Sequence, residues 1–291
     1  MKNLKATKIN SFEFYKSVVK SKRNSVADPD YTTRIKLFND DIERFYKIYD
    51  DCFNKKELGK LISNGYTDKE LEDLHKLYSY SQSVFQKLKT EITTTEHGRK
   101  ISTCQNCSVS EINSFDHFVP KMEFAEFVVN PKNLIPSCTI CNGHKSTAWR
   151  NGDKTVFLNL YLDALPNIQY LFVDVIIDVA KKSIVTTFSL NNKNAVDPDL
   201  YKIIEHHYLK LNLLNRFSEN NDSVITYVIN SITPNLGKLP LDEIRKSAIE
   251  TSKLNKIAFG HNYWKSILEI ELINNDEFVE HFIVNPVIKN S

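Results

Sequence analysis

The sequence predicts a mainly helical fold with a small α+β insert near the middle of the chain. Three features of the 291 residues lead to this prediction. Apolar residues recur at helical spacing over the first hundred residues and again after residue 197. Two Cys-x-x-Cys pairs lie about thirty residues apart between 104 and 141, and short β-prone runs lie between them and beyond them. We therefore expect three regions: helices over 1–98, a compact insert over 99–155, and a β-hairpin with further helices over 156–291.

Two helices are predicted in the N-terminal region. From Arg34 to Tyr49 the apolar residues follow a helical period, which predicts one helix with this buried stripe: Ile35, Phe38, Ile42, Phe45, Tyr46 and Tyr49. Thr67 and Glu70 form a capping-box pattern, which predicts that a second helix starts there and continues to about Thr90. Its buried face is expected to contain Leu71, Leu74, Leu77, Phe85 and Leu88. We interpret the aromatic residues of this region as core residues.

The insert is predicted to contain two strands and a helix. The run from Ser114 to Val119 is short and aromatic, and Pro120 ends it, which predicts a strand that carries Asp116 and His117. After the Asn130-Pro131 turn, the run 134–138 can form the return strand or a loop. From Cys141 onward the sequence is typical of a helix start, with Asn142, His144 and Lys145 near its N-terminus.

In the C-terminal region, the runs 168–179 and 184–190 are rich in β-branched residues and are joined by Ala-Lys-Lys, which predicts a hairpin. After Asp197-Pro198, the segment 201–217 is predicted to be helical, with one face formed by Ile203, Ile204, His207, Leu211 and Leu214. His206 and His207 point about 100° apart on such a helix, so they are interpreted as ordinary surface and core residues rather than as metal ligands. A last helical segment is predicted from Leu241 to Leu272, with an interruption near Gly260.

The cysteine spacing predicts a structural zinc site. Cys104 with Cys107, and Cys138 with Cys141, can each aim two sulfurs at one ion, and together they complete a tetrahedral shell with no position left for water. The alternatives are two unrelated pairs, or disulfides in a secreted protein. The chain opens MKNLKATKIN without an apolar signal segment, and Cys52 is the only other cysteine. We therefore expect a reducing, cytoplasmic location and no membrane-spanning segment.

The order Cys-x-x-Cys, Asp-His-x-x-Pro, Asn-Leu-x-x-x-Cys-x-x-Cys, then Asn and Lys, resembles the HNH family, the ββα-metal nucleases. The resemblance covers about fifty residues. It implies that His117 is the general base, and that Asp116 and Asn142 bind one catalytic Mg²⁺ or Mn²⁺. It also implies that Asn133 braces the loop that orients His117. Asn142 stands where many members have a second histidine, with His144 as a reserve ligand.

The residue chemistry is compatible with this resemblance. Hydrolysis of a phosphodiester needs an activated water and a cation that neutralises developing charge, and histidine titrates near neutral pH. In a regular strand, however, Asp116 and His117 would point to opposite faces. A shared site therefore requires either a bend in the backbone there or a metal and water that lie along the edge of the strand. Simpler interpretations are a turn role for Asn133 and a helix N-cap for Asn142. Lys145 is expected either to be solvated or to contact the scissile phosphate.

The charge of the chain is nearly balanced. The net charge is +2, from 38 basic and 36 acidic side chains, so any nucleic-acid groove must be local. From 99 to 154 there are seven basic and five acidic residues, and the candidate contacts are Arg99, Lys100, Lys121, Arg150 and Lys154. An ordinary mixed surface is the alternative. The first 23 residues hold seven basic residues and one acidic residue. A solvated arm is the favoured interpretation of this segment, and contact with DNA is the alternative.

A looser resemblance concerns the strings DHFVPK and VNPKNLIPSCTICN followed by a helical tail. They resemble HNH proteins of bacterial anti-phage systems, including Septu-type effectors that work with an ATPase. This resemblance implies control by an ATPase or another regulatory protein, because an unregulated nuclease would damage host DNA. The favoured function is a divalent-metal endonuclease that cuts DNA. The alternatives are a noncatalytic zinc module for nucleic-acid binding or assembly, and an HNH nuclease that cuts RNA, including transfer RNA.

Overall fold

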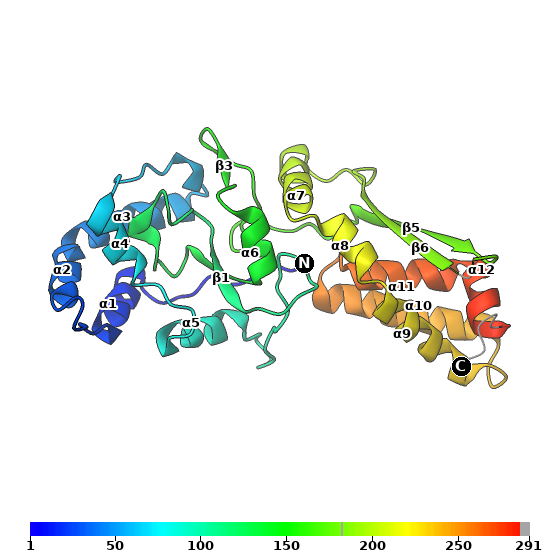
Figure 1. The fold of residues 1–291 in the computed structure, drawn as a ribbon. Coiled ribbons are helices and arrows are strands. Elements are labelled where there is room, and N and C mark those ends of the chain that lie inside the picture. The colour runs from blue at the N-terminus through cyan, green and yellow to red at the C-terminus, as the bar shows by residue number, and fades with distance from the viewer. Residues whose placement is uncertain (182, 286–291) are drawn as a thin grey trace. The chain divides into compact units, whose positions relative to one another are not determined.

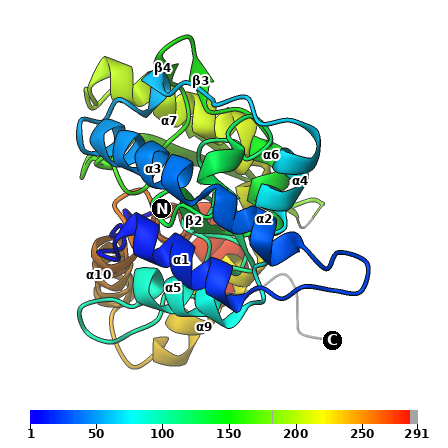
Figure 2. The ribbon, with the colours of Figure 1, turned by 90° about the vertical axis from the view of Figure 1, so that its left-hand side faces the viewer.

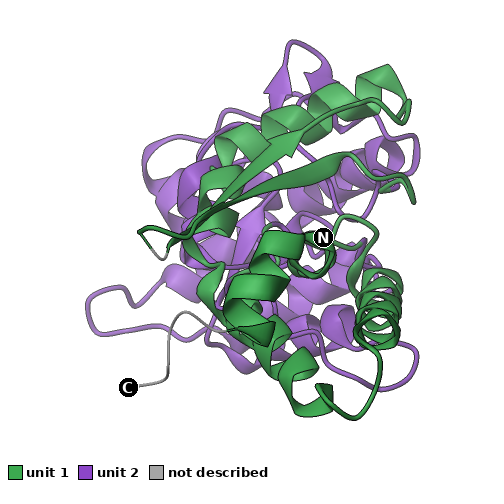
Figure 3. Ribbon diagram, turned by 90° about the vertical axis from the view of Figure 1, so that its right-hand side faces the viewer, with its two compact units in different colours: residues 1–2, 107–109, 165–291 green, residues 3–106, 110–164 purple. Residues whose placement is uncertain are grey.

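The computed structural model describes residues 1–181 and 183–285, and helices dominate it, as predicted (Figure 1). The chain divides into two compact units (Figure 3). Unit 2 contains residues 3–106 and 110–164, and unit 1 contains residues 1–2, 107–109 and 165–291. This division differs from the three predicted regions, because the N-terminal helices and the insert share one unit. The main boundary also lies after residue 164 rather than after 155.

Unit 2 begins with more helices than the two predicted from sequence (Figure 2). Their bounds are α1 Ser11–Ser21, α2 Tyr31–Leu37, α3 Asn39–Asn54, α4 Asp68–His75 and α5 Ser83–Thr93, with a 3-10 turn, η1, over Leu58–Lys60. The Asn10 side chain caps α1 by accepting from the backbone amides of Phe12 and Glu13. One face of α1 is buried, so the expectation of a solvated N-terminal arm is wrong.

The helix predicted from Arg34 to Tyr49 is interrupted at Phe38, which lies between α2 and α3. The Phe38 ring packs edge-on against Tyr66, with 5.5 Å between the ring centroids. Apart from Phe38, the predicted stripe is buried as expected. The apolar period was therefore informative about burial, but it did not show that the two helices change direction at one residue.

The helix predicted from Thr67 to Thr90 is also divided, into α4 and α5. Thr67 precedes α4, but its side chain makes no capping hydrogen bond, so the capping box is wrong. Between the helices, the Tyr78 hydroxyl accepts from the Phe115 amide at 3.2 Å, and the Tyr80 hydroxyl donates to the Ile112 carbonyl at 3.3 Å. These contacts with a distant segment favour leaving the helix after His75.

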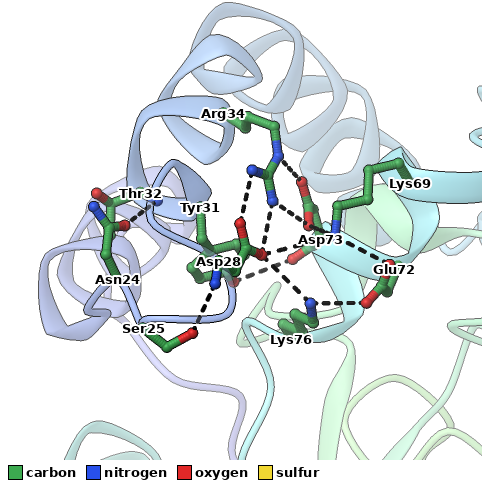
Figure 4. A network of polar contacts seen from close by, with 10 residues as sticks. All are labelled: Asn24, Ser25, Asp28, Tyr31, Thr32, Arg34, Lys69, Glu72, Asp73 and Lys76. Carbon is green, nitrogen blue, oxygen red and sulfur yellow. Dashed lines mark hydrogen bonds and ion pairs between the residues drawn. The ribbon is translucent and has the colours of Figure 1, made fainter.

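An ion-pair network ties α2 to α4 (Figure 4). The Arg34 guanidinium donates to Asp73 at 2.7 and 3.0 Å and to Asp28 at 2.8 and 2.9 Å. Lys69 and Lys76 surround the same two carboxylates, and Asp73 is buried. The loop that carries Asp28 is thereby attached to both helices.

The rest of unit 2 contains the predicted insert. Strands β1 Ser114–His117 and β2 Leu134–Ser137 form an antiparallel pair, followed by helix α6 Thr139–Lys145, which packs on β1. A 3-10 turn, η2, covers Ala125–Phe127, and a small hairpin pairs β3 Arg150–Asn151 with β4 Lys154–Thr155. Both main strands are confirmed. Helix α6 begins two residues earlier than predicted and ends at Lys145, so Asn142, His144 and Lys145 lie in its second half rather than near its N-terminus.

Unit 1 contains the predicted hairpin, formed by β5 Leu171–Asp178 and β6 Ser183–Leu190. Of the Ala-Lys-Lys connection, Lys182 lies outside the described residues. The remaining elements are α7 Pro198–Lys210, α8 Leu213–Glu219, α9 Asp222–Ile232, α10 Leu241–Phe259, α11 Trp264–Asn274 and α12 Asp276–Val279, with η3 Thr233–Asn235 and η4 Glu280–Val284. The helix predicted over 201–217 breaks at Asn212, whose φ of 51° is left-handed.

The core of unit 1 contains a cluster of aromatic rings among its aliphatic side chains. The Trp264 and Phe217 rings are stacked with centroids 5.2 Å apart, and the Trp264 indole N–H donates to the Ser108 carbonyl at 3.0 Å. The predicted interruption near Gly260 is confirmed, and its φ of 111° together with the nearby Met1 carbonyl leaves no room for a Cβ there. Throughout residues 1–181 and 183–285, no helix is long and apolar enough to cross a membrane.

Candidate active site

The two cysteine pairs come together as predicted. The sulfurs of Cys104, Cys107, Cys138 and Cys141 all lie within 4.8 Å of one another, and all four residues are buried and free of disulfides. In a tetrahedral zinc site with Zn–S bonds of about 2.3 Å, neighbouring sulfurs are about 3.8 Å apart, so this spacing fits. The cluster can therefore hold a zinc ion, and the alternatives of unrelated pairs and of disulfides do not fit the structure.

Backbone amides around the cluster point at its sulfurs. Cys138 lies at the N-cap of α6, where its sulfur accepts from the Cys141 amide at 3.3 Å. The Cys107 sulfur accepts from the Val109 amide at 3.4 Å. Donors to sulfur favour the thiolate form that metals require. The start of α6 is thus organised around the cluster.

Helix α6 is attached to β1 by the candidate ligands themselves. The Asn142 amide donates to the Phe115 carbonyl at 3.1 Å, which leaves its side-chain oxygen as the atom able to bind a cation. The Asp116 carboxylate accepts from the Lys145 ammonium, which is also on α6, at 3.2 Å. The structure therefore brings Asp116 and Asn142 to the same contact between strand and helix. Asn142 is not the N-cap of α6, because Cys138 occupies that position.

His117 is held in one orientation and one protonation state. Its Nε2 lies 2.8 Å from the Val128 carbonyl, and because a carbonyl oxygen only accepts, Nε2 must carry the proton. Burial lowers the pKa of His117 to about 3, an effect larger than the opposing hydrogen bond to Val128. The imidazole is therefore neutral near pH 7, and its Nδ1 carries a free lone pair. Such a nitrogen can accept a proton, but it is a weaker base than the histidine titrating near neutral pH that the sequence led us to expect.

Asn133 closes the loop that follows His117. Its oxygen accepts from the Val119 amide at 2.7 Å and from the Tyr49 hydroxyl at 3.3 Å. Its nitrogen donates to the carbonyls of Val119 at 3.0 Å and Phe127 at 3.2 Å. The residue is completely buried. All these contacts fix the backbone on both sides of the loop, a wider role than the turn cap considered from sequence.

Lys145 differs from both sequence expectations. Its side chain is only 1% exposed, so it is not solvated. Its ammonium donates to Asp116, to the His117 carbonyl at 2.8 Å and to the Phe118 carbonyl at 3.2 Å, which uses all three N–H groups. A contact with the scissile phosphate is therefore incompatible with this placement. Burial raises the pKa of Asp116, and the Lys145 charge opposes that shift.

The predicted bend between Asp116 and His117 is not visible in the strand pairing. The register of β1 with β2 is regular through His117, which pairs with Leu134. The two side chains also have different partners, since Asp116 contacts Lys145 of α6 and His117 contacts the loop at Val128. The structure thus places both residues in one strand–strand–helix unit while pointing them at different neighbours.

The predicted basic residues have different environments. Arg150 is not available for nucleic acid, because its guanidinium donates to the Gly59 and Leu61 carbonyls at 2.9 and 2.7 Å and to Glu123 at 2.8 Å. Lys121 is half-buried, with its ammonium 5.6 Å from the centre of the Tyr78 ring. Four candidates are exposed, namely Arg99, Lys100, Lys154 and the reserve ligand His144.

Two contributors to this site were missed from sequence. The Tyr78 ring packs edge-on against the His117 imidazole, with 4.8 Å between the centroids, and the Val128 carbonyl selects its tautomer. Tyr78 was included in a predicted helix, and its position before two serines was the only available signal that the helix ends there. The role of Val128 could not be predicted, because every residue type has a backbone carbonyl.

The fold and the site together define a mainly helical protein with a buried four-cysteine cluster that can hold a metal ion, next to a β-hairpin and a short helix. Two known proteins are similar to parts of it. Protein ea31 of Escherichia phage lambda is 24% identical over 191 residues, 62% of this chain and 64% of that protein. Septu protein PtuB of Bacillus thuringiensis is 36% identical over 64 residues, 22% of this chain and 24% of that protein.

The chain thus spans less than two thirds of the length of either relative. The second similarity agrees with the Septu-type resemblance noted from the sequence. No protein-family model matches the chain, and no solved structure matches it.

Proposed function

We propose that the protein is a divalent-metal-dependent endonuclease of the HNH type that hydrolyses phosphodiester bonds, most readily in DNA. The observation that carries the proposal is the state of His117: a neutral imidazole, locked by the Val128 carbonyl so that Nδ1 is the basic atom. It lies next to Asp116, on the strand to which Asn142 is bonded. These residues occur in the strand–strand–helix order that the HNH resemblance requires.

Each residue has a distinct role in this proposal. His117 accepts a proton from the attacking water at Nδ1, while its Nε2 stays bonded to Val128. Asp116 and Asn142 supply oxygen ligands of the kind that Mg²⁺ and Mn²⁺ prefer, and such an ion would neutralise charge on the phosphate and the leaving oxygen. Asn133 holds the loop around His117, and Lys145 holds Asp116 from the side of α6.

The test is plasmid cleavage with Mg²⁺ or Mn²⁺ by the wild type and by His117→Ala. Loss of a general base is expected to reduce the rate by about 100-fold or more. His144→Ala is the matched control, because that histidine is exposed and is expected to retain activity. Equal cutting by wild type and His117→Ala would reject the assigned base. A loss of activity in His144→Ala would instead identify it as the ligand held in reserve.

The choice between DNA and RNA belongs to the same assay. The residues around His117 do not distinguish the two sugars, so labelled DNA, RNA and transfer RNA should be offered in parallel. Faster cleavage of RNA than of DNA would keep the catalytic assignment and change the substrate.

A noncatalytic zinc module is the second candidate. It is favoured by one observation, the buried ion pair of Asp116 with Lys145, which occupies one oxygen of a proposed metal ligand. This candidate predicts binding to nucleic acid or to a protein, no cleavage with any divalent metal, and unchanged binding in Asp116→Ala. Cleavage that disappears in Asp116→Ala would exclude it.

We further propose a role in anti-phage defence under the control of a partner, for which the similarity to Septu protein PtuB is the support. The Septu-type resemblance makes an ATPase the expected partner, and a cytoplasmic location remains part of this proposal. The test is phage plating on bacteria that express the chain alone, a candidate ATPase partner alone, or both. Protection only by the pair, abolished by His117→Ala, is the expected result.

A further inference from the structure

The N-terminal helices of unit 2 carry a basic hollow that the proposed catalytic residues do not share. Nine residues line it, from α1, the loop after α1, α2 and the first residue of α3, and its volume is about 540 Å³. Five of these nine are basic and none is acidic, and the basic ones are Lys16, Lys20, Lys22, Arg23 and Lys36. The chain as a whole is nearly neutral, so this is a local concentration of positive charge.

Three of these lysines can contact a ligand. Lys16, Lys20 and Lys36 are exposed. Lys16 pairs with Glu13 one turn away at 2.5 Å, but both side chains are solvated and such pairs are weak, so an anion can replace Glu13. Lys16 and Lys20 are four residues apart and therefore follow one another along the same face of α1.

The other two cations support the wall of the hollow. The Lys22 ammonium donates to the Lys76 carbonyl at 2.8 Å and to the Gln82 side chain at 3.1 Å. Arg23 donates to the carbonyls of Lys20 and Lys22 at 3.0 and 2.8 Å, at the end of α1. The Lys20 carbonyl lies in the last turn of α1, at the negative end of the helix dipole, which would otherwise repel an anion. Arg23 therefore makes the end of α1 more favourable for negative charge.

We propose that this hollow binds the sugar–phosphate backbone of nucleic acid, as a docking site for the substrate of the proposed nuclease. A row of cations along a helix suits a linear polyanion, whose backbone it can follow, better than it suits a single phosphate. The proposal depends on the proposed function for its substrate, but binding is separable from cleavage.

The experiment measures binding of a fluorescent DNA oligonucleotide by anisotropy across a series of salt concentrations. The full-length His117→Ala protein is the parent, so that cleavage does not interfere. The variant Lys20→Gln/Lys36→Gln removes two exposed charges of the hollow. We expect weaker binding and a slope of log affinity against log salt that is shallower by about 0.7 to 0.9 for each lost phosphate contact. The variant Lys20→Arg/Lys36→Arg keeps both charges and should bind with the affinity of the parent. That result would show that binding depends on the charge of these two side chains.

The matched control is Lys8→Gln/Lys87→Gln, which removes two exposed charges from other parts of unit 2. An equal loss of affinity in this control, or unchanged binding in the hollow variant, would overturn the proposal. So would a parent that binds no oligonucleotide, or one that binds anionic phosphatidylserine vesicles through Lys20 and Lys36 instead of DNA. If the wild type binds DNA through the hollow but never cleaves it, the proposed nuclease function is rejected and the proposed binding site is kept.

Discussion

The pair of Lys145 and Asp116 is the least solvated ion pair associated with the candidate site, with side chains 1% and 3% exposed. Removing one partner of a buried pair leaves the other charge without compensation, which typically costs about 3–5 kcal/mol. We therefore predict that Lys145→Met lowers the free energy of unfolding by roughly that amount, measured by urea denaturation. Lys154→Met, at an exposed lysine, should stay within about 0.5 kcal/mol of wild type. A stable Lys145→Met protein would show that Asp116 becomes neutral or finds another partner.

Asn133 is predicted to contribute to stability as much as to activity. Asn133→Ala would leave the buried Val119 amide and carbonyl without side-chain partners, at about 1–3 kcal/mol for each unsatisfied group. We expect a loss of about 2–4 kcal/mol in the free energy of unfolding, together with reduced cleavage. Asn142→Ala is the comparison, because Asn142 is half-buried and donates one hydrogen bond, so it should cost about 1 kcal/mol. Equal stability losses in the two variants would contradict the bracing role.

At the scale of elements, α6 depends on the metal cluster, because Cys138 is its N-cap and Cys141 lies in its first turn. Structural zinc affinity is also folding free energy, so we predict that Cys138→Ser or a chelator lowers the melting temperature and the bound zinc content. Cys52→Ser is the matched control, since Cys52 is a half-buried cysteine outside the cluster. Full zinc content and an unchanged melting curve in Cys138→Ser would reject the four-sulfur shell.

The network between α2 and α4 gives unit 2 a predicted acid sensitivity. Hydrogen bonds from Arg34 lower the pKa of Asp28 to about 2. Burial alone would raise the pKa of Asp73, but hydrogen bonds from Arg34 and Lys69 outweigh it, so that pKa is also lowered. Lowered carboxyl pKa values stabilise the fold above the unfolded value near 4, and this contribution is lost as pH falls toward 2.

Arg34→Met should therefore lower the melting temperature by several degrees at neutral pH, and the difference from wild type should shrink as the pH falls from about 4 to 2. Melting curves recorded over that pH range measure it. A difference that stays constant with pH would mean that Arg34 acts through packing rather than through the two carboxylates.

The elements also show what the sequence could predict. Local patterns were sufficient for β1 and for the β5–β6 hairpin, because short aromatic or β-branched runs bounded by turn residues depend on neighbouring residues alone. They left the segment of β2 open as a strand or a loop. The cysteine cluster followed from spacing. The helix breaks at Phe38 and between His75 and Ser83 did not follow from local patterns, because they depend on contacts with Tyr66, Ile112 and Phe115.

The candidate site, like the fold, could be predicted from the sequence only in part. Residue types were sufficient to propose Asp116, His117, Asn133 and Asn142 as candidates, but they did not reveal which groups would contact these side chains. The Val128 carbonyl, which fixes the tautomer of His117, is invisible in sequence, and the burial of Lys145 could be known only from the fold. Arg150 was misjudged for the same reason, since its partners are backbone carbonyls of η1 and its neighbour.

At the scale of the whole molecule, the two compact units have separate aromatic cores. Tyr49 and Phe127, with ring centroids 4.8 Å apart, belong to unit 2, and Phe217 and Trp264 belong to unit 1. Units with their own cores can unfold in separate transitions. The chain has two tryptophans, and each unit contains one of them, Trp149 in unit 2 and Trp264 in unit 1. Fluorescence can therefore follow the units individually.

We predict that Trp264→Phe, which keeps Trp149, reports a urea midpoint that falls when zinc is chelated, because three of the four cysteines belong to unit 2. Trp149→Phe, which keeps Trp264, should report a midpoint that moves much less. The reason is that Trp264 stacks on Phe217 and packs edge-on against Phe188, and both of these residues are far from the cysteines in sequence. The hydrogen bond from the Trp264 indole to the Ser108 carbonyl is a single contact beside Cys107. Midpoints that fall together by the same amount would mean that the chain unfolds as one cooperative structure, and that the metal cluster stabilises both cores.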